Sequence, residues 1–368
     1  MKRILFITPT FGYTGSEMLL WYSLSHLNQD KFKAYLFSKK NGKLIETLPS
    51  HIKSFVPYKI GNNKFNKILR VFLKWLKIDP LRFQLSRIQK TIKADYWYVN
   101  TIVNPEVYQI ASDLGVKVVT HVHELPLAYG FIAYKEMESL LNYSQLIIGC
   151  SKAVCDKIVG MGKTSVHLFY GFVDQAKIRI SKNAELLRKE LGFEENDYIW
   201  AVSGKTTFTK GIDFLIPLLE RLPANVKILW IGGEENTGLY YYVKKTIAER
   251  FAGKVLFTGE QKDDYYNYLN CSNAFLLLSR EDSFPLVMLE AAVLGKPIVG
   301  FNSGGIKEFV EEKMGIVVDS WSFDDLVKAM STVQNYGENF DTNRIKEKAT
   351  EYDASKQVGR WEEILESI

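Results

Sequence analysis

Short apolar runs alternate with longer amphipathic stretches along most of this 368-residue chain, and this alternation restricts the possible folds more than any other feature. The apolar runs have the length and composition of buried strands, and the amphipathic stretches have the spacing of helices that cover a sheet. A strand, a helix and a second strand in succession form a βαβ unit, so the pattern predicts a parallel sheet. In the first half the strand candidates are 4–7, 34–37, 96–99, 116–119 and 146–148, and the helix candidates include 17–27 and 106–114.

The alternation starts again after a polar segment at 174–197. The chain is long enough for two domains, each with its own core. We therefore predict an α/β protein with two Rossmann-like domains, 1–172 and 173–354, and a final amphipathic helix at 355–368. Ligands of open α/β sheets bind at the carboxyl ends of the strands, so both domains can contribute loops to one cleft. The second-half strand candidates are 198–202, 227–231, 255–257, 274–278 and 297–299.

The cysteines and the hydropathy of the chain indicate a cytoplasmic location. Cys150, Cys155 and Cys271 are an odd set without paired spacing, so neither a disulfide framework nor a zinc site of the CxxC type is expected. The apolar run at 4–7 is too short for an export signal, and no run reaches the roughly 18 apolar residues of a membrane span.

The segment 279–299 is the most informative for function. It runs from the end of a strand through a loop into a helix, and Pro285 suits the first turn of that helix. The free N–H groups of Leu286 and Val287 then form an anion site, and Asp282 and Glu290 can bind hydroxyl groups on either side of it. The alternative is a charge at a helix start and a solvated helix residue. It fits less well because Glu290 lies in an otherwise apolar stretch, where unpaired carboxylates are rare.

A second polar loop follows the strand at 198–202. Lys205 and Lys210 lie on either side of this loop and could neutralise a diphosphate. Two surface lysines are the alternative interpretation, since lysine is usually exposed. The presence of both segments in one predicted domain favours a site.

Two segments of the first half also follow predicted strands. The loop 8–15 contains Gly12 and Gly15, which permit close backbone approach or positive φ. It is not G-x-G-x-x-G, so a dinucleotide site is not supported. The segment 120–126 places His121, His123 and Glu124 after a strand. A metal site is the other interpretation, but a spaced further ligand is missing, as is any D-x-D motif.

These segments together resemble the retaining GT-B glycosyltransferases of glycosyltransferase family 4, also called group 1. Asp282 and Glu290 are similar to the E-x7-E signature of that family, and 291–299 and 302–308 resemble the segments that follow it. The sequence departs from the family pattern at three positions. The first acid is Asp282 with Glu281 beside it, Pro285 stands where Gly is frequent, and Lys205 stands where Arg is more frequent.

The resemblance implies a GT-B fold, with two Rossmann-like domains facing each other across a cleft and the helix 355–368 packing back on the first. It implies a metal-independent hexosyltransferase that needs no cofactor, since the nucleotide-sugar is a co-substrate. The acceptor would be a glycan, a lipid-linked molecule or another hydroxyl compound, in cell-surface polysaccharide or glycolipid synthesis. The implied catalytic residues are His123, Asp282, Glu290 and Lys210. The implied donor-binding residues are Gly15, Lys205, Lys210, Glu281, Phe284, Leu286, Val287 and Glu290.

Two other functions remain open at this point. A GT-B enzyme of another reaction, such as a nucleotide-sugar epimerase, would share the fold. A catalytically silent subunit would bind nucleotide without transfer.

Positive charge is concentrated between residues 59 and 93. This stretch holds ten Lys or Arg residues and a single acid, Asp79. Apolar residues recur there at helical spacing, which predicts a basic amphipathic helix at an anionic membrane surface. The alternative is an ordinary helix with a solvated face. The basic stretch is local and lies in no recognisable nucleic-acid module, so nucleic acid is not an expected partner. We expect peripheral association with the inner face of the plasma membrane.

Overall fold

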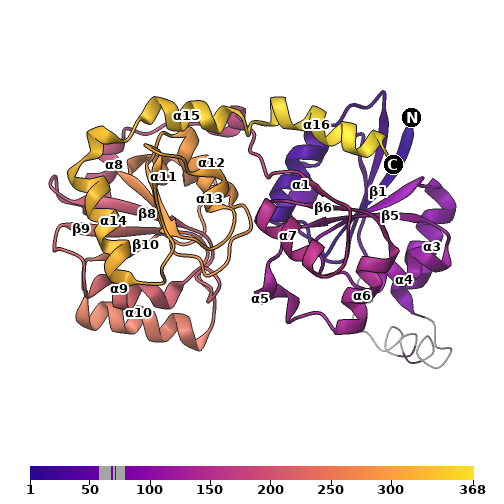
Figure 1. Ribbon diagram of the computed structural model, residues 1–368, viewed down its shortest axis with the longest axis horizontal. Helices are drawn as coiled ribbons and strands as arrows, with labels where there is room; N and C mark the ends of the chain where they lie inside the picture. The colour runs from indigo at the N-terminus through magenta and orange to yellow at the C-terminus, as the bar shows by residue number, and fades with distance from the viewer. Residues whose placement is uncertain (58–67, 69–70, 72–78) are drawn as a thin grey trace. The chain divides into compact units, whose positions relative to one another are not determined.

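The computed structural model describes residues 1–57, 68, 71 and 79–368, and these form two compact units. Unit 1 comprises Met1–Cys150, Val154–Phe169 and Val358–Ile368. Unit 2 comprises Ser151–Ala153 and Tyr170–Gln357. The last helix, α16, therefore contributes most of its residues to the unit that begins the chain (Figure 1).

Unit 1 is a seven-stranded sheet in the order β3-β2-β1-β4-β5-β6-β7, with every described pairing parallel. Its strands are β1 (Lys2–Thr8), β2 (Phe32–Ser38), β3 (Lys53–Phe55), β4 (Tyr96–Asn100), β5 (Lys117–Val122), β6 (Ser144–Gly149) and β7 (Val166–Leu168). Its helices are α1 (Gly15–His26), η1 (Lys43–Thr47), α3 (Pro80–Ile92), α4 (Glu106–Asp113), α5 (Pro126–Tyr129), α6 (Tyr134–Tyr143), α7 (Lys152–Gly160) and α16 (Ala354–Glu366).

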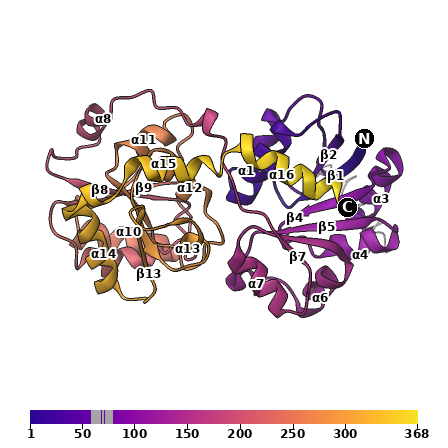
Figure 2. The same ribbon diagram turned by 45° about the horizontal axis from the view of Figure 1, so that its top comes forward.

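Helix α16 covers the sheet of unit 1 beside α1, and the two helices lie side by side in both ribbon views (Figures 1 and 2). The buried Trp361 of α16 lies 5.7 Å from the Phe6 ring of β1 and 5.8 Å from the Tyr98 ring of β4. Its indole N–H donates to the Tyr98 hydroxyl at 3.1 Å. An amphipathic helix that buries its large apolar side chains in this way is stabilised mainly by that packing.

Unit 2 is a six-stranded parallel sheet in the order β10-β9-β8-β11-β12-β13, which is the Rossmann order. Its strands are β8 (Tyr198–Ser203), β9 (Val226–Ile231), β10 (Val255–Phe257), β11 (Ala274–Leu277), β12 (Ile298–Phe301) and β13 (Gly315–Val318). Its helices are η2 (Gln175–Lys177), α8 (Ala184–Glu190), η3 (Ile212–Phe214), α9 (Leu215–Leu219), α10 (Gly238–Arg250), α11 (Tyr265–Cys271), α12 (Leu286–Val293), α13 (Ile306–Phe309), α14 (Phe323–Asn335), η4 (Gly337–Asn339) and α15 (Thr342–Thr350).

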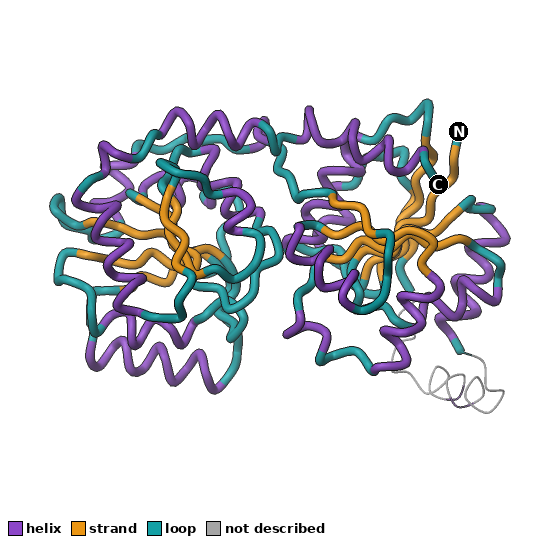
Figure 3. The backbone as a smooth tube through the Cα atoms, viewed as in Figure 1, coloured by secondary structure: helices purple, strands orange, loops and turns teal. Residues whose placement is uncertain are grey.

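Each unit has the layered construction that the alternating sequence predicts. The strands lie at the centre of each unit and the helices surround them (Figure 3). Ile199, Trp200, Ala201 and Val202 in β8 are buried, as expected of a parallel strand covered on both faces. The strand order turns from one direction to the other between β1 and β4 in unit 1 and between β8 and β11 in unit 2. These are the points where ligands of such folds bind.

The predicted basic amphipathic helix lies mostly outside the described residues, in the range 58–78. In the described part of the basic stretch, α3 begins after Asp79, which accepts a hydrogen bond from Leu81 N–H at 2.9 Å. Among the residues that the structure describes, no helix is long and apolar enough to cross a membrane.

Candidate functional site

Two loops meet at the point in unit 2 where the strand order reverses. One follows β8 and carries Lys205 and Lys210, and the other follows β11 and carries Asp282. Gly211 has a φ of +74°, and a Cβ atom built on it would lie 2.3 Å from the carbonyl oxygen of Leu278. Only glycine permits this approach, so the two loops touch through their backbones.

Lys210 and Asp282 form an ion pair between these loops. The Lys210 Nζ lies 2.5 Å from Asp282 Oδ2, and the Ser279 hydroxyl donates to the same oxygen at 2.9 Å. The Lys210 stem runs along Gly204, where a Cβ atom would come within 3.3 Å of it. The Lys210 side chain keeps 27% of its surface exposed and that of Asp282 keeps 11%, so the ammonium group stays accessible to an anion.

Arg280 ties the same two loops together at a second place. Its guanidinium donates to both carboxylate oxygens of Asp213, at 2.8 and 2.6 Å, and to the Phe208 carbonyl. It also lies 3.7 Å from the ring centre of Phe208 and 3.9 Å from that of Phe214. A guanidinium between two aromatic faces gains cation–π attraction on both sides. Arg280 thus fixes the loops that carry Lys210 and Asp282, a role that the sequence analysis missed.

Lys205 lies on the same loop as Lys210 and is exposed. In the part of the chain that the structure describes, it takes part in no ion pair. Its position at the carboxyl end of β8 leaves its ammonium group available to an anionic ligand.

Glu290 is buried in α12, with 8% of its surface exposed, so the alternative of a solvated helix residue is wrong. The Tyr265 hydroxyl donates to its Oε2 at 2.9 Å and the Tyr266 hydroxyl donates to its Oε1 at 3.1 Å. Burial raises the pKa of Glu290 to about 7, and the two phenol hydrogen bonds oppose that rise. Neither tyrosine is among the site residues that the sequence predicts.

The start of α12 lies beside this carboxylate and the ion pair. Pro285 is its N-cap, with φ −70° and ψ 122°, so Leu286 and Val287 open the helix as expected. Their N–H groups belong to the first turn, which has no intrahelical acceptor for them. The Phe284 side chain packs against Tyr170 and Tyr352, at ring distances of 4.8 and 5.4 Å. Phe284 therefore offers a ligand only its backbone.

The predicted residues of unit 1 gather at the carboxyl ends of β4 and β5. His123 Nε2 lies 3.0 Å from Asn100 Oδ1, and the His123 N–H donates to Glu124 Oε2 at 2.9 Å. Burial lowers the pKa of His123 to about 3 and raises that of Glu124 to about 7. The His123 imidazole is therefore uncharged at neutral pH and can act as a hydrogen-bonding group.

His121 lies inside the unit, next to His123. Its Nδ1 is 2.7 Å from the Tyr98 hydroxyl, and its ring centre is 3.9 Å from that of His123. Tyr98 also accepts from the indole N–H of Trp361, so its hydroxyl links His121 to α16. His121 is thereby held as a packing neighbour of His123. Within the described residues, no cluster of three or more His, Cys, Asp or Glu side chains could hold a metal ion.

The loop between β1 and α1 differs from the expectation. Neither Gly12 nor Gly15 has positive φ, and a Cβ on Gly15 would meet no atom within 4 Å. The close approach occurs instead at Gly42, whose Cβ would lie 2.1 Å from the Phe11 carbonyl oxygen. The loop is shaped by the buried Glu17, which accepts from Gly12 N–H at 2.9 Å.

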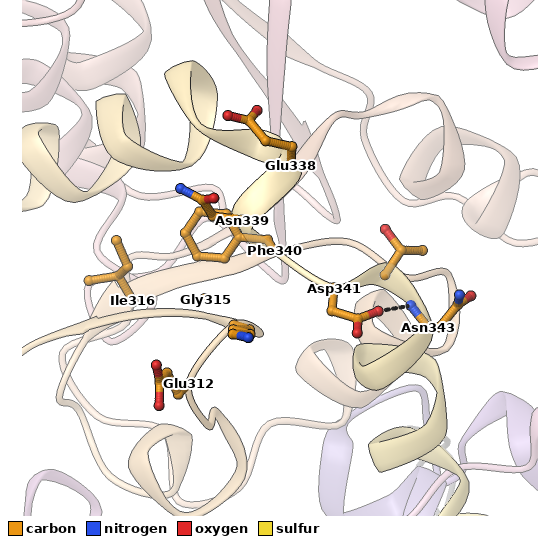
Figure 4. Close-up of a pocket in the computed structure, with 10 residues that line it drawn as sticks. Glu312, Gly315, Ile316, Glu338, Asn339, Phe340, Asp341 and Asn343 are labelled. Carbon is orange, nitrogen blue, oxygen red and sulfur yellow. Dashed lines mark hydrogen bonds between the residues drawn. The ribbon is translucent and has the colours of Figure 1, made fainter.

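A hollow of about 770 Å³ lies elsewhere on unit 2, beside the edge strand β13 (Figure 4). Glu312, Glu338 and Asp341 line it with only Lys313 as a cation, so it would repel a diphosphate. Asp341 also accepts from the N–H groups of Asn343 and Arg344 at the start of α15. None of the predicted site residues lines this hollow.

Comparison with known proteins identifies the family. Residues 183–352, which include the whole candidate site of unit 2, match the family model described as glycosyl transferases group 1. An uncharacterized glycosyltransferase of Haemophilus influenzae is 30% identical over 312 residues, covering 77% of this chain and 84% of that protein. The chain belongs to the group 1 glycosyltransferases.

The fraction of a relative's length that this glycosyltransferase covers differs from one relative to the next. The alpha-galactosylglucosyldiacylglycerol synthase of Streptococcus pneumoniae is 31% identical over 176 residues, which are 46% of each chain. This chain thus spans just under half the length of that relative. The crystal structure of Anabaena HepE in complex with UDP and glucose has a TM-score of 0.84 and 19% identity, with both chains covered completely. That likeness confirms the GT-B fold of two Rossmann-like units.

Proposed function

We propose that this glycosyltransferase moves a sugar from a nucleotide-sugar donor to a hydroxyl acceptor with retention of anomeric configuration. The observation that carries the proposal is the pairing of Lys210 with Asp282 at the strand-order reversal of unit 2. The buried Glu290 and the start of α12 lie at the same carboxyl edge.

Stabilisation of the leaving diphosphate is the main task of the site. Breaking the bond between the anomeric carbon and the phosphate oxygen leaves negative charge on the diphosphate. Lys205, Lys210 and the N–H groups of Leu286 and Val287 are the donors that would meet it. Lysine supplies a point charge without the bidentate fork of arginine, so the helix start would supply the directional hydrogen bonds.

The remaining polar groups would hold the two sugars of the donor. In unit 2, Glu290 would bind the ribose hydroxyls, while Asp282, with Glu281 beside it, would bind the transferred sugar. In unit 1, the neutral His123 would act as a hydrogen-bonding group for a sugar hydroxyl. The acceptor hydroxyl oxygen would bond to the anomeric carbon as the bond from that carbon to the diphosphate breaks. An oxygen of the leaving phosphate would take the hydroxyl proton. No metal ion or cofactor has a step in this scheme.

The acceptor is proposed from chemistry and from relatives. The Streptococcus relative is named as a synthase of a glycosylated diacylglycerol, so a glycolipid or a lipid-linked glycan is our preferred acceptor class. The ten basic residues between 59 and 93 would draw the enzyme to the anionic inner face of the plasma membrane. Flotation with phosphatidylglycerol liposomes should fail when four of these residues become Glu, namely Lys67, Arg70, Lys74 and Lys77. Unchanged flotation would exclude membrane association through these residues.

The transfer reaction is tested with UDP-, GDP- and ADP-sugars. The donor that raises the melting temperature most is incubated with a glycolipid acceptor, and nucleotide release is measured. We expect Lys210→Ala and Glu290→Gln to lower kcat/KM by about 100-fold or more. Lys245→Ala, which removes an exposed lysine of the same unit, should have no effect. Full turnover by both site variants would exclude this site.

Binding without transfer or donor hydrolysis would instead identify a silent nucleotide-binding subunit. Conversion of the free nucleotide-sugar into an epimer would identify an epimerase. Both results contradict the proposed transfer while leaving the fold unchanged.

A further inference from the structure

The two tyrosines at the start of α11 donate hydrogen bonds to Glu290 and leave its carboxylate with acceptor positions that suit a vicinal diol. An ionised carboxylate has two oxygens, each with about two acceptor positions. Tyr266 fills one position on Oε1 and Tyr265 fills one position on Oε2. In the part of the chain that the structure describes, one position on each oxygen is left, which is the arrangement that two neighbouring hydroxyl groups require.

The direction of each hydrogen bond follows from the carboxylate. An ionised Glu290 only accepts, so both phenols donate to it. The Tyr265 oxygen can then accept from the Ser203 hydroxyl, which lies 2.8 Å from it. Ser203 is the last residue of β8. The hydrogen bonds between Ser203 and Tyr265 and between Tyr265 and Glu290 therefore connect the carboxyl end of β8 to α12.

The two phenols also fix the plane of the carboxylate. Their rings are 5.0 Å apart at 72° to each other, so they approach Glu290 from different directions. A carboxylate that is held from two sides cannot rotate about its terminal bond without losing a charge-assisted hydrogen bond. Its orientation is therefore set before a ligand arrives, which lowers the cost of binding.

We propose that Tyr265 and Tyr266 are positioning residues that orient Glu290 toward the 2′ and 3′ hydroxyls of the donor ribose. This inference rests on the proposed function, because it requires a nucleotide in the site of unit 2. It adds two side chains that act on the ribose only through Glu290.

The test compares a ribonucleotide with the analogue that lacks the diol. UDP, GDP and ADP are titrated calorimetrically into the full chain, and the tightest binder is used with its 2′,3′-dideoxy analogue. We expect Tyr265→Phe and Tyr266→Phe to weaken the ribonucleotide about fivefold to tenfold, and to leave the dideoxy analogue unchanged. Ser203→Ala should weaken the ribonucleotide in the same selective way, by a smaller factor.

Tyr268→Phe is the matched control. Tyr268 lies on the same helix, and its hydroxyl makes no hydrogen bond to Glu290 in the part of the chain that the structure describes. Its affinities for both nucleotides should equal those of the wild type, and melting temperatures establish that every variant is folded.

Three outcomes would overturn the proposal. An equal loss of affinity for both nucleotides would show that the tyrosines only stabilise the unit. Unchanged affinity for both would show that Glu290 does not need them. A wild-type chain that binds none of the three nucleotides contradicts the proposed function itself, and the inference falls with it.

Discussion

The buried carboxyl of Glu290 lowers the stability of the folded chain, and the same carboxyl is the proposed ribose-binding group. Its carboxyl is removed from water among apolar neighbours and is compensated by two phenol hydrogen bonds. Burial outweighs those bonds, since the pKa lies at about 7 against an ordinary value of 4.5. A ribose diol would supply further donors to the ionised form, so the bound nucleotide would offset part of the cost.

The raised pKa of Glu290 predicts how stability depends on pH. Between pH 4.5 and 7 the folded chain keeps a proton on this carboxyl that the unfolded chain has released. The free energy of unfolding therefore falls as pH rises through this window, by roughly 3 kcal/mol from this group. Urea unfolding at pH 5, 6 and 7 measures the slope in the wild type and in Glu290→Gln, and the substitution should remove the negative contribution of this carboxyl from the total.

Glu124 has a pKa raised to about 7 by the same cause and contributes a slope of the same sign. Burial lowers the pKa values of His121 and His123, and these two groups contribute a slope of the opposite sign. Adding Glu124→Gln to Glu290→Gln should therefore shift the slope further in the positive direction. A slope that Glu290→Gln leaves unchanged would contradict the buried, protonated state of that carboxyl at pH 5.

Gly211 gives a second prediction at this scale. Gly211→Ala places a Cβ 2.3 Å from the Leu278 carbonyl oxygen, at a φ of +74°. Gly192 has a similar φ of +79° but no atom within 4 Å of its Cβ position. Gly192→Ala should thus lower the free energy of unfolding by about 1–2 kcal/mol, the cost of the left-handed conformation for a residue with a Cβ. Gly211→Ala should lower the free energy of unfolding by clearly more. Urea unfolding compares the two, and equal costs would show that the loops do not need this contact.

Loops on neighbouring strands, rather than single residues, make the candidate site. The loops after β8 and β11 are joined at Gly211, at the Lys210–Asp282 ion pair and at Arg280. The backbone adds a further link, from Arg280 N–H to the Thr209 carbonyl at 2.8 Å. Their relative position is therefore fixed in the absence of ligand, as electrostatic catalysis requires.

Arg280→Lys tests this connection between loops. Lysine keeps the charge but loses the bidentate contact to Asp213 and the planar stacking between Phe208 and Phe214. We expect a loss of about 1–3 kcal/mol in the free energy of unfolding and a weaker affinity for the nucleotide. Circular dichroism in urea and calorimetric titration measure these two quantities.

Arg250→Lys is the matched control, since Arg250 pairs with Glu220 on the surface and lies 5.0 Å from the Phe251 ring. An exposed pair contributes little, so this variant should resemble the wild type. Equal effects of the two substitutions would refute a special role for Arg280.

The sequence predicted the central strands and the edge strand β10, but it missed the edge strands β3, β7 and β13. Buried strands such as β8 and β9 have the apolar runs that identify them, and the structure gives them nearly the expected bounds. The edge strands β3 and β7 have only three residues each, and β7 leaves His167 and Leu168 exposed. A strand so short and half-exposed has no detectable periodicity.

The same limit applies to the candidate site. Lys210, Asp282 and Glu290 were found because the motif carries them within short stretches. Tyr265 and Tyr266 meet Glu290 through side chains of α11 and α12, the helices before and after β11. The sequence pattern predicts the two helices, but it does not predict which of their side chains form hydrogen bonds. Arg280 was passed over for the same reason, since its partners lie on the other loop.

At the scale of the whole molecule, unit 1 is discontinuous in sequence. The chain leaves it after Phe169, forms unit 2 and returns with Val358–Ile368. Helix α16 is fastened there by Trp361, by Glu362, which accepts from Asn28 N–H at 2.7 Å, and by Lys2, whose ammonium donates to the Glu366 carbonyl at 2.7 Å. The core of unit 1 is therefore completed only by the last residues of the chain.

Trp361→Ala tests whether unit 1 depends on this returning helix. The substitution empties a buried site between Phe6 and Tyr98 and removes the indole donor of Tyr98, so we expect a loss of about 3–5 kcal/mol. Glu363→Ala changes an exposed residue of the same helix and should cost less than about 0.5 kcal/mol. The affinity for the tightest binder among UDP, GDP and ADP, whose proposed phosphate and ribose contacts lie in unit 2, should stay within about twofold of the wild type. Urea unfolding followed by circular dichroism measures the stability, and titration with the same nucleotide measures the affinity. A Trp361→Ala chain that loses nucleotide binding but keeps its free energy of unfolding would contradict a role of α16 in the core of unit 1.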